Sequence, residues 1–301
     1  MTAIQLDDLT KTYGDVTALQ NVDLTVADGE VFGFLGPNGA GKSTTIDILL
    51  DQVRPTAGSA EVFGLDAQAD SVAVRERTGV LPDGYGTLGV MTGREHVEFA
   101  FEAKNADGDV DAVLERVGIA HAADRKATAY SKGMAQRLML GMAVAGEPDL
   151  LLLDEPTTGL DPNGARRMRE IVEAERDRGA TVFFSSHILE QVEAVCDRVG
   201  ILDQGRLVAV DSIDDLRETA GSTGQLRVAF ESVPDGLADA VASVEGVASV
   251  TVEGTDLVVG CEDGAKAAVI NRCFEAGTVL DVETTEASLE DIFVSYTGGA
   301  R

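Results

Sequence analysis

The chain has 301 residues, of which 44% are hydrophobic and 25% are charged, and this composition is typical of a globular protein with a full core. Its formal net charge of -28 argues against nucleic-acid binding, because such binding needs a positive surface that replaces the counterions on phosphates. No stretch approaches the roughly 18 uncharged apolar residues of a membrane-spanning helix, so we expect no span.

The acidic residues are scattered along the chain rather than gathered in one tail. One interpretation is an acidic surface that binds a cationic partner. The interpretation we favour is a solvated acidic shell adapted to concentrated salt, since high ionic strength screens the repulsion between like charges. The low lysine content agrees with this interpretation, and we expect a halophilic protein.

The N-terminal stretch MTAIQLDDLTKTYG has neither the basic nor the apolar region of a secretory signal peptide. We therefore expect a cytoplasmic protein, whose role at a membrane depends on a partner. Histidine is scarce (His96, His121 and His187), which argues against a histidine-based metal enzyme.

In chain order, residues 2–35 alternate polar and apolar residues between turn signals and predict strands, the last of which runs into a glycine-rich loop. A helix is predicted from about Lys42. Residues 92–146 carry apolar residues at three- and four-residue spacing, which predicts a helical insertion. Beyond it, a buried aliphatic strand (LLLLD) is followed by alternating helices and strands as far as RLVAV. This alternation predicts an α/β fold with a mostly parallel sheet.

A small-residue linker, AGSTG, follows at residues 220–224. The residues after it predict the order βαββαβ, which is ferredoxin-like, closed by an amphipathic helix over residues 288–297. We therefore expect a nucleotide-binding domain over residues 1–220, with a helical subdomain at about residues 85–146, and a small α+β accessory domain over residues 221–301.

The strongest local motif is a complete phosphate-binding loop, G-x-x-x-x-G-K-[ST], between a predicted strand and a predicted helix. Glycines let backbone N–H groups converge on an anion, and a helix N-terminus favours negative charge. Lys42 can reach the β- and γ-phosphates of a nucleotide, and the Ser43 hydroxyl can bind Mg²⁺. The residues expected to bind the nucleotide here are Gly36, Pro37, Asn38, Gly39, Ala40, Gly41, Lys42, Ser43 and Thr44.

A second motif is the aliphatic strand that ends in two acids and a proline. Asp154, at the end of the buried strand, is placed to hold Mg²⁺, and Glu155 can orient or deprotonate the water that attacks the γ-phosphate. By itself the pattern fits an ordinary strand and turn equally well. Together with the phosphate loop it indicates nucleotide hydrolysis.

The order of these motifs over residues 1 to about 220 resembles that of an ATP-binding-cassette (ABC) ATPase, a P-loop NTPase. The resemblance implies ATP and Mg²⁺ as cofactors, and a cassette fold with a mixed sheet and a helical subdomain. It implies that Tyr13 stacks on adenine. It also implies that Lys42 and Glu155 act in catalysis together with His187, which contacts the γ-phosphate.

The stretch YSKGM resembles the family signature sequence, in which Ser131 and Gly133 cap the γ-phosphate held by the opposite subunit. It departs from the family pattern at Lys132 and Met134.

A further departure is Asp83, which stands where the family usually has glutamine. A carboxylate there can still bind Mg²⁺, although its added negative charge can change metal affinity. The implied metal ligands are therefore Ser43, Asp83 and Asp154.

The resemblance also implies partners. Composite sites form between two cassettes, so a second ATPase subunit is needed, most simply another copy of this chain. A separate integral-membrane permease would hold the protein on the inner face of the cell membrane. The segment MTGREH and the C-terminal extension SLEDIFVSYTGG resemble those of multidrug and antibiotic-resistance exporters, so we expect an export ATPase.

Other functions are less consistent with the sequence. A soluble cassette ATPase acting on DNA or ribosomes is disfavoured, because no long coiled coil, second cassette or basic surface is present. A non-catalytic binding module is disfavoured by the intact Lys42, Asp154, Glu155 and His187. An importer subunit stays open, since only family analogy favours export.

Overall fold

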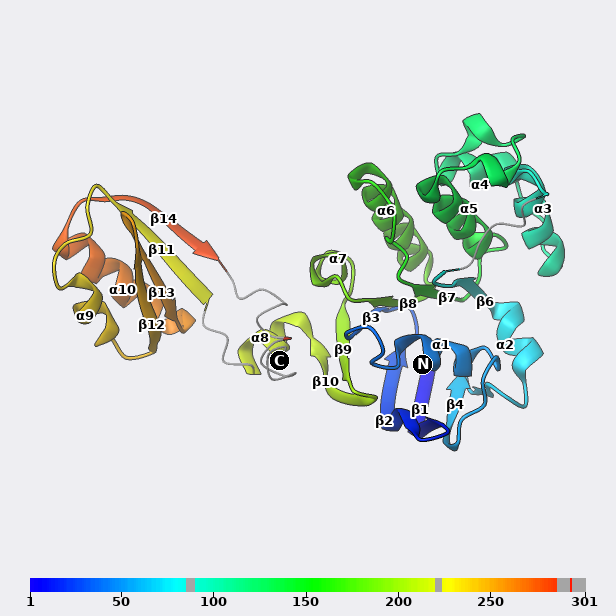
Figure 1. Ribbon diagram of the computed structural model, residues 1–301, viewed down its shortest axis with the longest axis horizontal. Coiled ribbons are helices and arrows are strands. Elements are labelled where there is room, and N and C mark those ends of the chain that lie inside the picture. The colour runs from blue at the N-terminus through cyan, green and yellow to red at the C-terminus, as the bar shows by residue number, and fades with distance from the viewer. Residues whose placement is uncertain (85–89, 220–223, 286–292, 294–301) are drawn as a thin grey trace. The chain divides into compact units, whose positions relative to one another are not determined.

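The computed structural model describes residues 1–84, 90–219, 224–285 and 293. Its chain divides into two compact units, Met1–Ser212 and Ile213–Arg301. Figure 1 labels their helices and strands. Within the described residues, no helix is both long enough and apolar enough to cross a bilayer.

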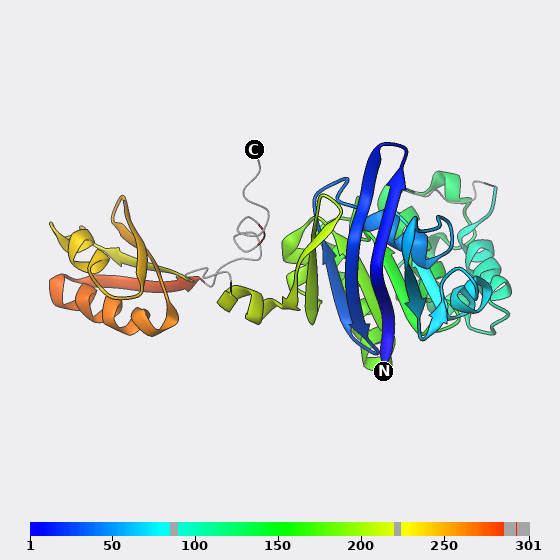
Figure 2. The same cartoon turned by 90° about the horizontal axis from the view of Figure 1, so that it is seen from below.

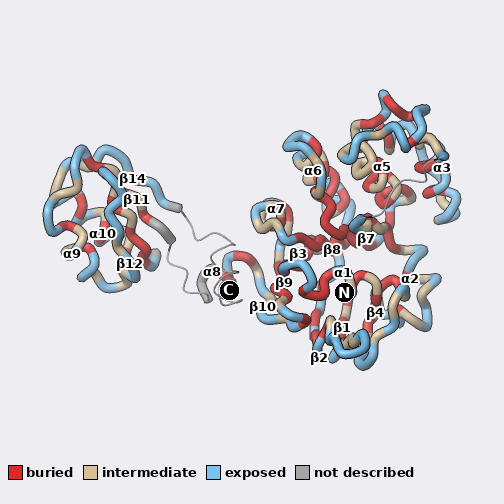
Figure 3. The backbone as a smooth tube through the Cα atoms, in the orientation of Figure 1, coloured by how far each residue is buried: buried red, intermediate tan, exposed pale blue. Residues whose placement is uncertain are grey.

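The centre of the first unit is a mostly parallel sheet. In spatial order its strands are β10 (Arg206–Ser212), β9 (Arg198–Asp203), β3 (Val31–Leu35), β8 (Thr181–Ser186), β7 (Leu150–Asp154) and β6 (Thr78–Leu81). Strands β3, β7 and β8 are buried along their whole length, as expected for apolar runs in a parallel sheet covered on both faces (Figure 3). Phe32 and Phe183 stack across neighbouring strands, with ring centroids 5.8 Å apart.

A second, antiparallel sheet belongs to the same unit. Its strands in spatial order are β2 (Val16–Ala27), β1 (Thr2–Tyr13), β4 (Ala57–Val62) and β5 (Leu65–Asp66). Figure 2 shows the long hairpin of β1 and β2. Helix α1 (Lys42–Leu49) lies between the two sheets and contacts β2, β4 and β7. Its residues Ile46, Ile48 and Leu49 enter the core that both sheets share, so α1 is held rigidly at the end of β3.

Helices cover the other face of the parallel sheet (Figure 1). Helices α6 (Pro162–Arg178) and α7 (Leu189–Glu193) pack on β8. Between β6 and β7 the chain forms α3 (Gly93–Ala103), α4 (Val110–Arg116) and α5 (Lys132–Val144), with 3-10 turns at Ala120–Ala122 and Ala127–Ala129. Helix α2 (Ser71–Arg77) precedes β6.

Side chains determine where these helices begin. Thr92 and Glu95 form a capping box at the start of α3, in which each side chain accepts a backbone N–H of the other residue. The side chains of Ser131 and Asp161 cap α5 and α6 in the same sense, accepting from Met134 N and Gly164 N.

The second unit starts with α8 (Ile213–Thr219) and continues with β11 (Gly224–Phe230), α9 (Leu237–Ala242), β12 (Val247–Glu253), β13 (Asp256–Cys261), α10 (Asp263–Ala276) and β14 (Val279–Thr285). The strands pair antiparallel in the spatial order β12-β13-β11-β14. This is the ferredoxin-like arrangement that the sequence predicts. Leu226, Val228 and Val259 of the sheet pack against Leu237 and Val269 of α9 and α10.

The division between the units follows Ser212, so α8 groups with the C-terminal unit by its contacts. Residues 220–223 of the predicted linker lie outside the described residues, and the predicted domain boundary at residue 220 stays a prediction. The helix predicted for residues 288–297 also lies outside them, apart from Phe293.

Candidate nucleotide-binding site

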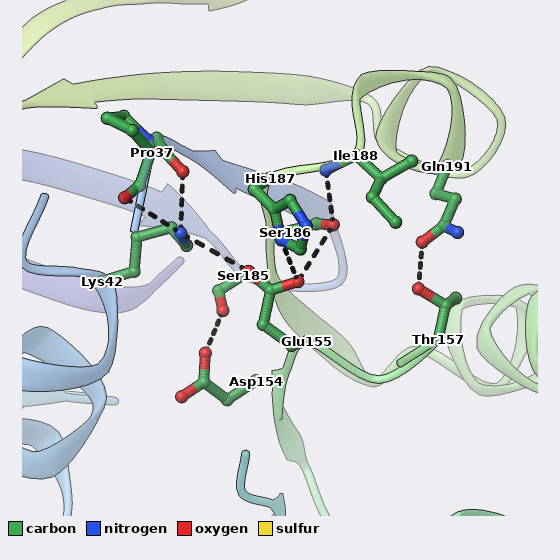
Figure 4. A network of polar contacts seen from close by, with 11 residues as sticks. Pro37, Lys42, Asp154, Glu155, Thr157, Ser185, Ser186, His187, Ile188 and Gln191 are labelled. Atoms are coloured by element: carbon green, nitrogen blue, oxygen red, sulfur yellow. Dashed lines mark hydrogen bonds and ion pairs between the residues drawn. The ribbon is translucent and has the colours of Figure 1, made fainter. Parts of the chain in front are cut away.

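The candidate site lies where the carboxyl ends of β3, β7 and β8 meet. In the parallel register, Leu35 pairs with Ser186 and Asp154 pairs with Ser185. The segments that follow these strands therefore leave the sheet side by side. They carry the phosphate loop, the two acids and His187 (Figure 4). In the sequence, more than a hundred residues separate the loop from the acids.

The phosphate loop runs from the end of β3 to the start of α1 and depends on its glycines. Gly41 has a φ of 114°, in the left-handed region that favours glycine. A Cβ on Gly36 would lie 2.4 Å from the carbonyl oxygen of Leu202, so no larger residue fits there. The loop thus presents the N-terminus of α1, where backbone N–H groups and the helix dipole favour a phosphate.

Lys42 is enclosed by the loop, and only 6% of it is exposed. Its Nζ donates to the carbonyl oxygen of Gly36 at 2.7 Å and to that of Pro37 at 3.4 Å. It also lies 3.4 Å from Oε1 of Glu155. The lysine is therefore a desolvated positive charge held between the loop and the acid.

Glu155 contacts two other predicted site residues, Lys42 and His187. Its backbone has a φ of 48°, an uncommon conformation for a residue with a side chain. His187 Nδ1 lies 2.8 Å from Glu155 Oε2, and the Ser186 hydroxyl lies 3.5 Å from the same oxygen. Oε1 is buried and has no hydrogen-bond partner among the described residues, with the Lys42 ammonium as its neighbour. A buried carboxylate oxygen with spare acceptor capacity can receive a proton from a bound water.

Asp154 is buried beside this group, and the Ser185 hydroxyl donates to its Oδ1 (Figure 4). Asp47 of α1 faces the same region. Burial raises the pKa of Asp47 above its ordinary value, and the negative charge of Asp154 raises it further. Negative charge is therefore concentrated at the end of β7, as expected where a cation binds.

A polar cavity of about 150 Å³ opens over the phosphate loop. It is lined by Ala18, Asn38, Gly39, Gly41, Lys42, Ser43, Thr44, Asp83 and Glu155. Most of the residues predicted from the phosphate loop thus share one cavity with Asp83 and Glu155. Gly36 and Pro37 do not line the cavity, but their carbonyl oxygens accept from Lys42 Nζ, and Ala40 is buried.

Other predicted residues do not line this cavity. Tyr13 is 46% exposed, with Lys11 Nζ 4.8 Å from the centroid of its ring. Ser131 is exposed at the start of α5, and a Cβ on Gly133 would lie 3.2 Å from the carbonyl oxygen of Gly159. The predicted contacts of Tyr13 with adenine and of Ser131 and Gly133 with a second subunit's nucleotide stay predictions.

The donor set fits a hard divalent cation. Ser43, Asp83 and Asp154 offer hydroxyl and carboxylate oxygens, the ligands that Mg²⁺ prefers. Among the described residues there is no group of three or more His, Cys, Asp or Glu able to hold a metal alone.

Several residues of the site were not predicted. Ser185 and Ser186 hold the two acids, and Thr157 bonds to Gln191 behind them. The pair of serines at the end of the apolar run TVFFSS was the available signal, since polar residues there leave the sheet at the same edge as Asp154. No local sequence pattern indicated the bond between Thr157 and Gln191.

A glycine loop between a parallel strand and a helix, facing an Asp-Glu pair on a neighbouring strand, defines a P-loop nucleotide-hydrolysing protein. The family model described as ABC transporter matches residues 19–158. The chain is 34% identical to the bacitracin transport ATP-binding protein BcrA of Bacillus licheniformis, over 99% of this chain and 98% of that one. It is 35% identical to the daunorubicin resistance ATP-binding protein DrrA3 of Streptomyces coeruleorubidus, over 100% and 97%.

Among solved structures, the ATP-binding subunit of an ABC transporter matches with a TM-score of 0.68 and 29% identity, over 73% of this chain and 94% of that one. The chain belongs to the family of ABC transporter ATP-binding proteins. It is an ATP-binding and ATP-hydrolysing transporter subunit, and the predicted cassette fold is confirmed.

Proposed function

We propose that this chain powers the export of a drug-like or antibiotic compound through a separate membrane permease. Relatives named for bacitracin transport and daunorubicin resistance support this, because they match over nearly their whole length. The match therefore includes the C-terminal unit, which lies beyond the region of the general family model, residues 19–158. Bound to that permease, the subunit would act at the inner face of the cell membrane.

The proposed roles follow the geometry. The loop N–H groups and Lys42 bind the β- and γ-phosphates, and Ser43, Asp154 and Asp83 would hold Mg²⁺, which would neutralise phosphate charge. Glu155 orients the attacking water and accepts its proton, and His187 holds Glu155 and contacts the γ-phosphate.

The proposed assembly is a dimer of two copies of this chain. Ser131 and Gly133 lie away from the cavity of their own chain, which supports a role at the nucleotide of the partner. The site would then be complete only when two cassettes close over ATP, and opening would follow hydrolysis.

The observation that carries the ATPase mechanism is the convergence of Lys42, Glu155 and His187 within 3.4 Å contacts at one end of the sheet. The test is Glu155→Gln in the full chain. We expect ATP turnover to fall by about 100-fold or more, because the general base is lost, while ATP still binds. Glu173→Gln, an exposed position on α6, is the matched control. Normal turnover in Glu155→Gln would contradict the proposed mechanism.

Export is tested separately, in membranes that also contain a permease that co-purifies with this chain. Inverted membrane vesicles that contain both proteins should accumulate a drug on addition of ATP, and vesicles with Glu155→Gln should not. ATP-dependent release of preloaded compound from the vesicles instead would indicate an importer.

A further inference from the structure

Two sets of side-chain contacts, which we call ties, join two turns at the carboxyl end of the parallel sheet. One turn follows β7 and contains Glu155 and Thr157; the other follows β8 and leads through His187 into α7. Figure 4 shows both ties. The first joins Glu155 to His187 and Ser186, and the second joins Thr157 to Gln191.

The first tie consists of groups that take part in the chemistry. Glu155 lines the cavity, and both Glu155 and His187 are proposed to act on water and phosphate. Their contact at 2.8 Å competes with ligand contacts, so it cannot by itself define the position of His187 throughout the cycle.

The second tie consists of two groups that the proposed chemistry does not use. The Thr157 hydroxyl donates to Oε1 of Gln191, and neither side chain ionises between pH 4 and 10. Thr157 is 6% exposed, so water competes poorly for the bond. Neither residue lines the cavity as the described residues define it. This bond can therefore persist while the first tie changes partners.

The turn that carries Thr157 is fixed by more bonds than the helix that carries Gln191. The turn after β7 is fixed by further bonds, from Glu155 N to Ser185 O at 3.1 Å and from Gln136 Nε2 to Pro156 O at 3.2 Å. Helix α7 spans Leu189–Glu193, has no side-chain cap at its N-terminus and buries Val192. So short a helix has little stability of its own. The His187 side chain that precedes it is 45% exposed.

We infer that Thr157 and Gln191 are positioning residues, which together set the distance between His187 and Glu155 through the start of α7. The inference rests on the proposed catalytic roles of Glu155 and His187. Its consequence is specific: loss of the bond should disturb the hydrolytic step and leave nucleotide binding by the phosphate loop intact.

The test uses Thr157→Val and Gln191→Leu, which remove the donor or the acceptor with little change in volume. We expect each to lower kcat for ATP by about 10- to 100-fold, because small misplacements of catalytic groups have effects of that size. KM for ATP should stay within about twofold, since binding is not touched. The double variant should be no slower than the slower single variant, because both remove the same bond.

Rescue distinguishes this role from general damage to the fold. Thr157→Ser keeps the hydroxyl, and Gln191→Glu keeps an oxygen that accepts it, so both should retain near wild-type kcat. Gln68→Leu is the matched control, because this half-buried glutamine also makes one side-chain bond, to Ile48 O at 2.9 Å. The rescue variants also answer the question if a valine or leucine variant fails to fold.

Three results would overturn the inference: wild-type kcat in Gln191→Leu, independent losses in the two single variants that multiply in the double variant, or slow Thr157→Ser and Gln191→Glu variants that are fully folded. Failure of the proposed function is separable. It appears as normal turnover in Glu155→Gln, whereas an inactive Glu155→Gln beside a fully active Gln191→Leu refutes the positioning pair alone.

Discussion

Glu155 combines an uncommon backbone conformation with a buried charge. A φ of 48° turns the chain sharply after β7, so that the carboxylate returns toward Lys42 instead of continuing along the strand. Such conformations cost about 1–3 kcal/mol and persist where the surroundings determine them. Here the surroundings are the Lys42 ammonium, the His187 ring and the backbone bond to Ser185. Contacts within the candidate site therefore offset the cost of this conformation.

Asp83 offers a test at the residue scale. Its carboxylate shares the cavity with Ser43, so Asp83→Ala should remove an oxygen ligand and raise the Mg²⁺ concentration for half-maximal ATPase activity by about tenfold. The measurement is a Mg²⁺ titration at fixed ATP, with Mg²⁺-dependent nucleotide binding as a second readout. Asp7→Ala, an exposed acid on β1, should leave the midpoint unchanged. An unchanged midpoint in Asp83→Ala would exclude the residue from the metal site.

Among elements, α6 joins the helical insertion to the sheet through a buried charge. Glu175 of α6 has a side chain only 1% exposed, with Arg116 of α4 at 2.7 Å on one oxygen and Arg178 at 2.7 Å on the other. Arg167 of α6 donates to the carbonyl oxygen of Glu115, at the end of α4. Cations at a helix C-terminus are stabilising, so α4 is held there by charge as well as packing.

Glu175→Ala should therefore lower the free energy of unfolding by about 2–3 kcal/mol, because it leaves two guanidinium groups without their shared carboxylate. Urea denaturation measures this change. Glu170→Ala removes an exposed pair with Arg166 on the same helix and should cost less than about 0.5 kcal/mol. Equal changes in the free energy of unfolding would show that the buried ion pairs of Glu175 contribute no more to stability than the exposed pair.

Lys104, next to this cluster, makes stability depend on pH. Burial lowers its pKa from 10.5 to about 8, although Glu175 opposes the shift. Below pH 8 Lys104 is protonated in both the folded and the unfolded state, and the folded state bears the cost of a buried ammonium. Between pH 8 and 10.5 the unfolded state binds more protons than the folded state, so the free energy of unfolding rises with pH.

Lys104→Met should remove this dependence. Relative to wild type it should stabilise the protein more at about pH 7.5 than at about pH 10, because the wild type has shed its buried charge by then. Paired urea titrations at the two pH values test this. The same difference between variant and wild type at both pH values would show that Lys104 keeps its ordinary pKa.

For the whole molecule, we expect charge repulsion to dominate the response to salt. The chain carries 52 acidic residues against 24 basic ones. We expect the melting temperature to rise markedly between about 0.1 and 2 M KCl, because the Debye length falls from about 10 Å to under 3 Å and repulsion within the folded state is screened. Sucrose at equal osmolality is the control. A melting temperature that is flat or falls with KCl would refute the proposal of a halophilic acidic shell.

Much of the fold could be predicted because the evidence for it is local. The phosphate loop needs particular residue types at fixed spacing between a strand and a helix. The apolar runs that became β7 and β8 are typical of buried parallel strands beside such a loop. The βαββαβ order after residue 223 likewise follows from short alternating patterns. By contrast, no strand was predicted over residues 57–66, where β4 pairs with β1, far away in sequence, and β5 pairs with β4 to complete the antiparallel sheet.

The sequence alone determined the class of protein, since residue types at fixed short spacing already specify a loop that binds phosphate and an acid pair that activates water. Only the tertiary structure decided which side chains support them: Ser185 on Asp154, Gln191 on Thr157, and Glu175 between Arg116 and Arg178. The physical reason is that hydrogen bonds and ion pairs depend on distances of about 3 Å in space. Residues separated by tens of positions reach those distances only through the register of the sheet and the packing of helices on it.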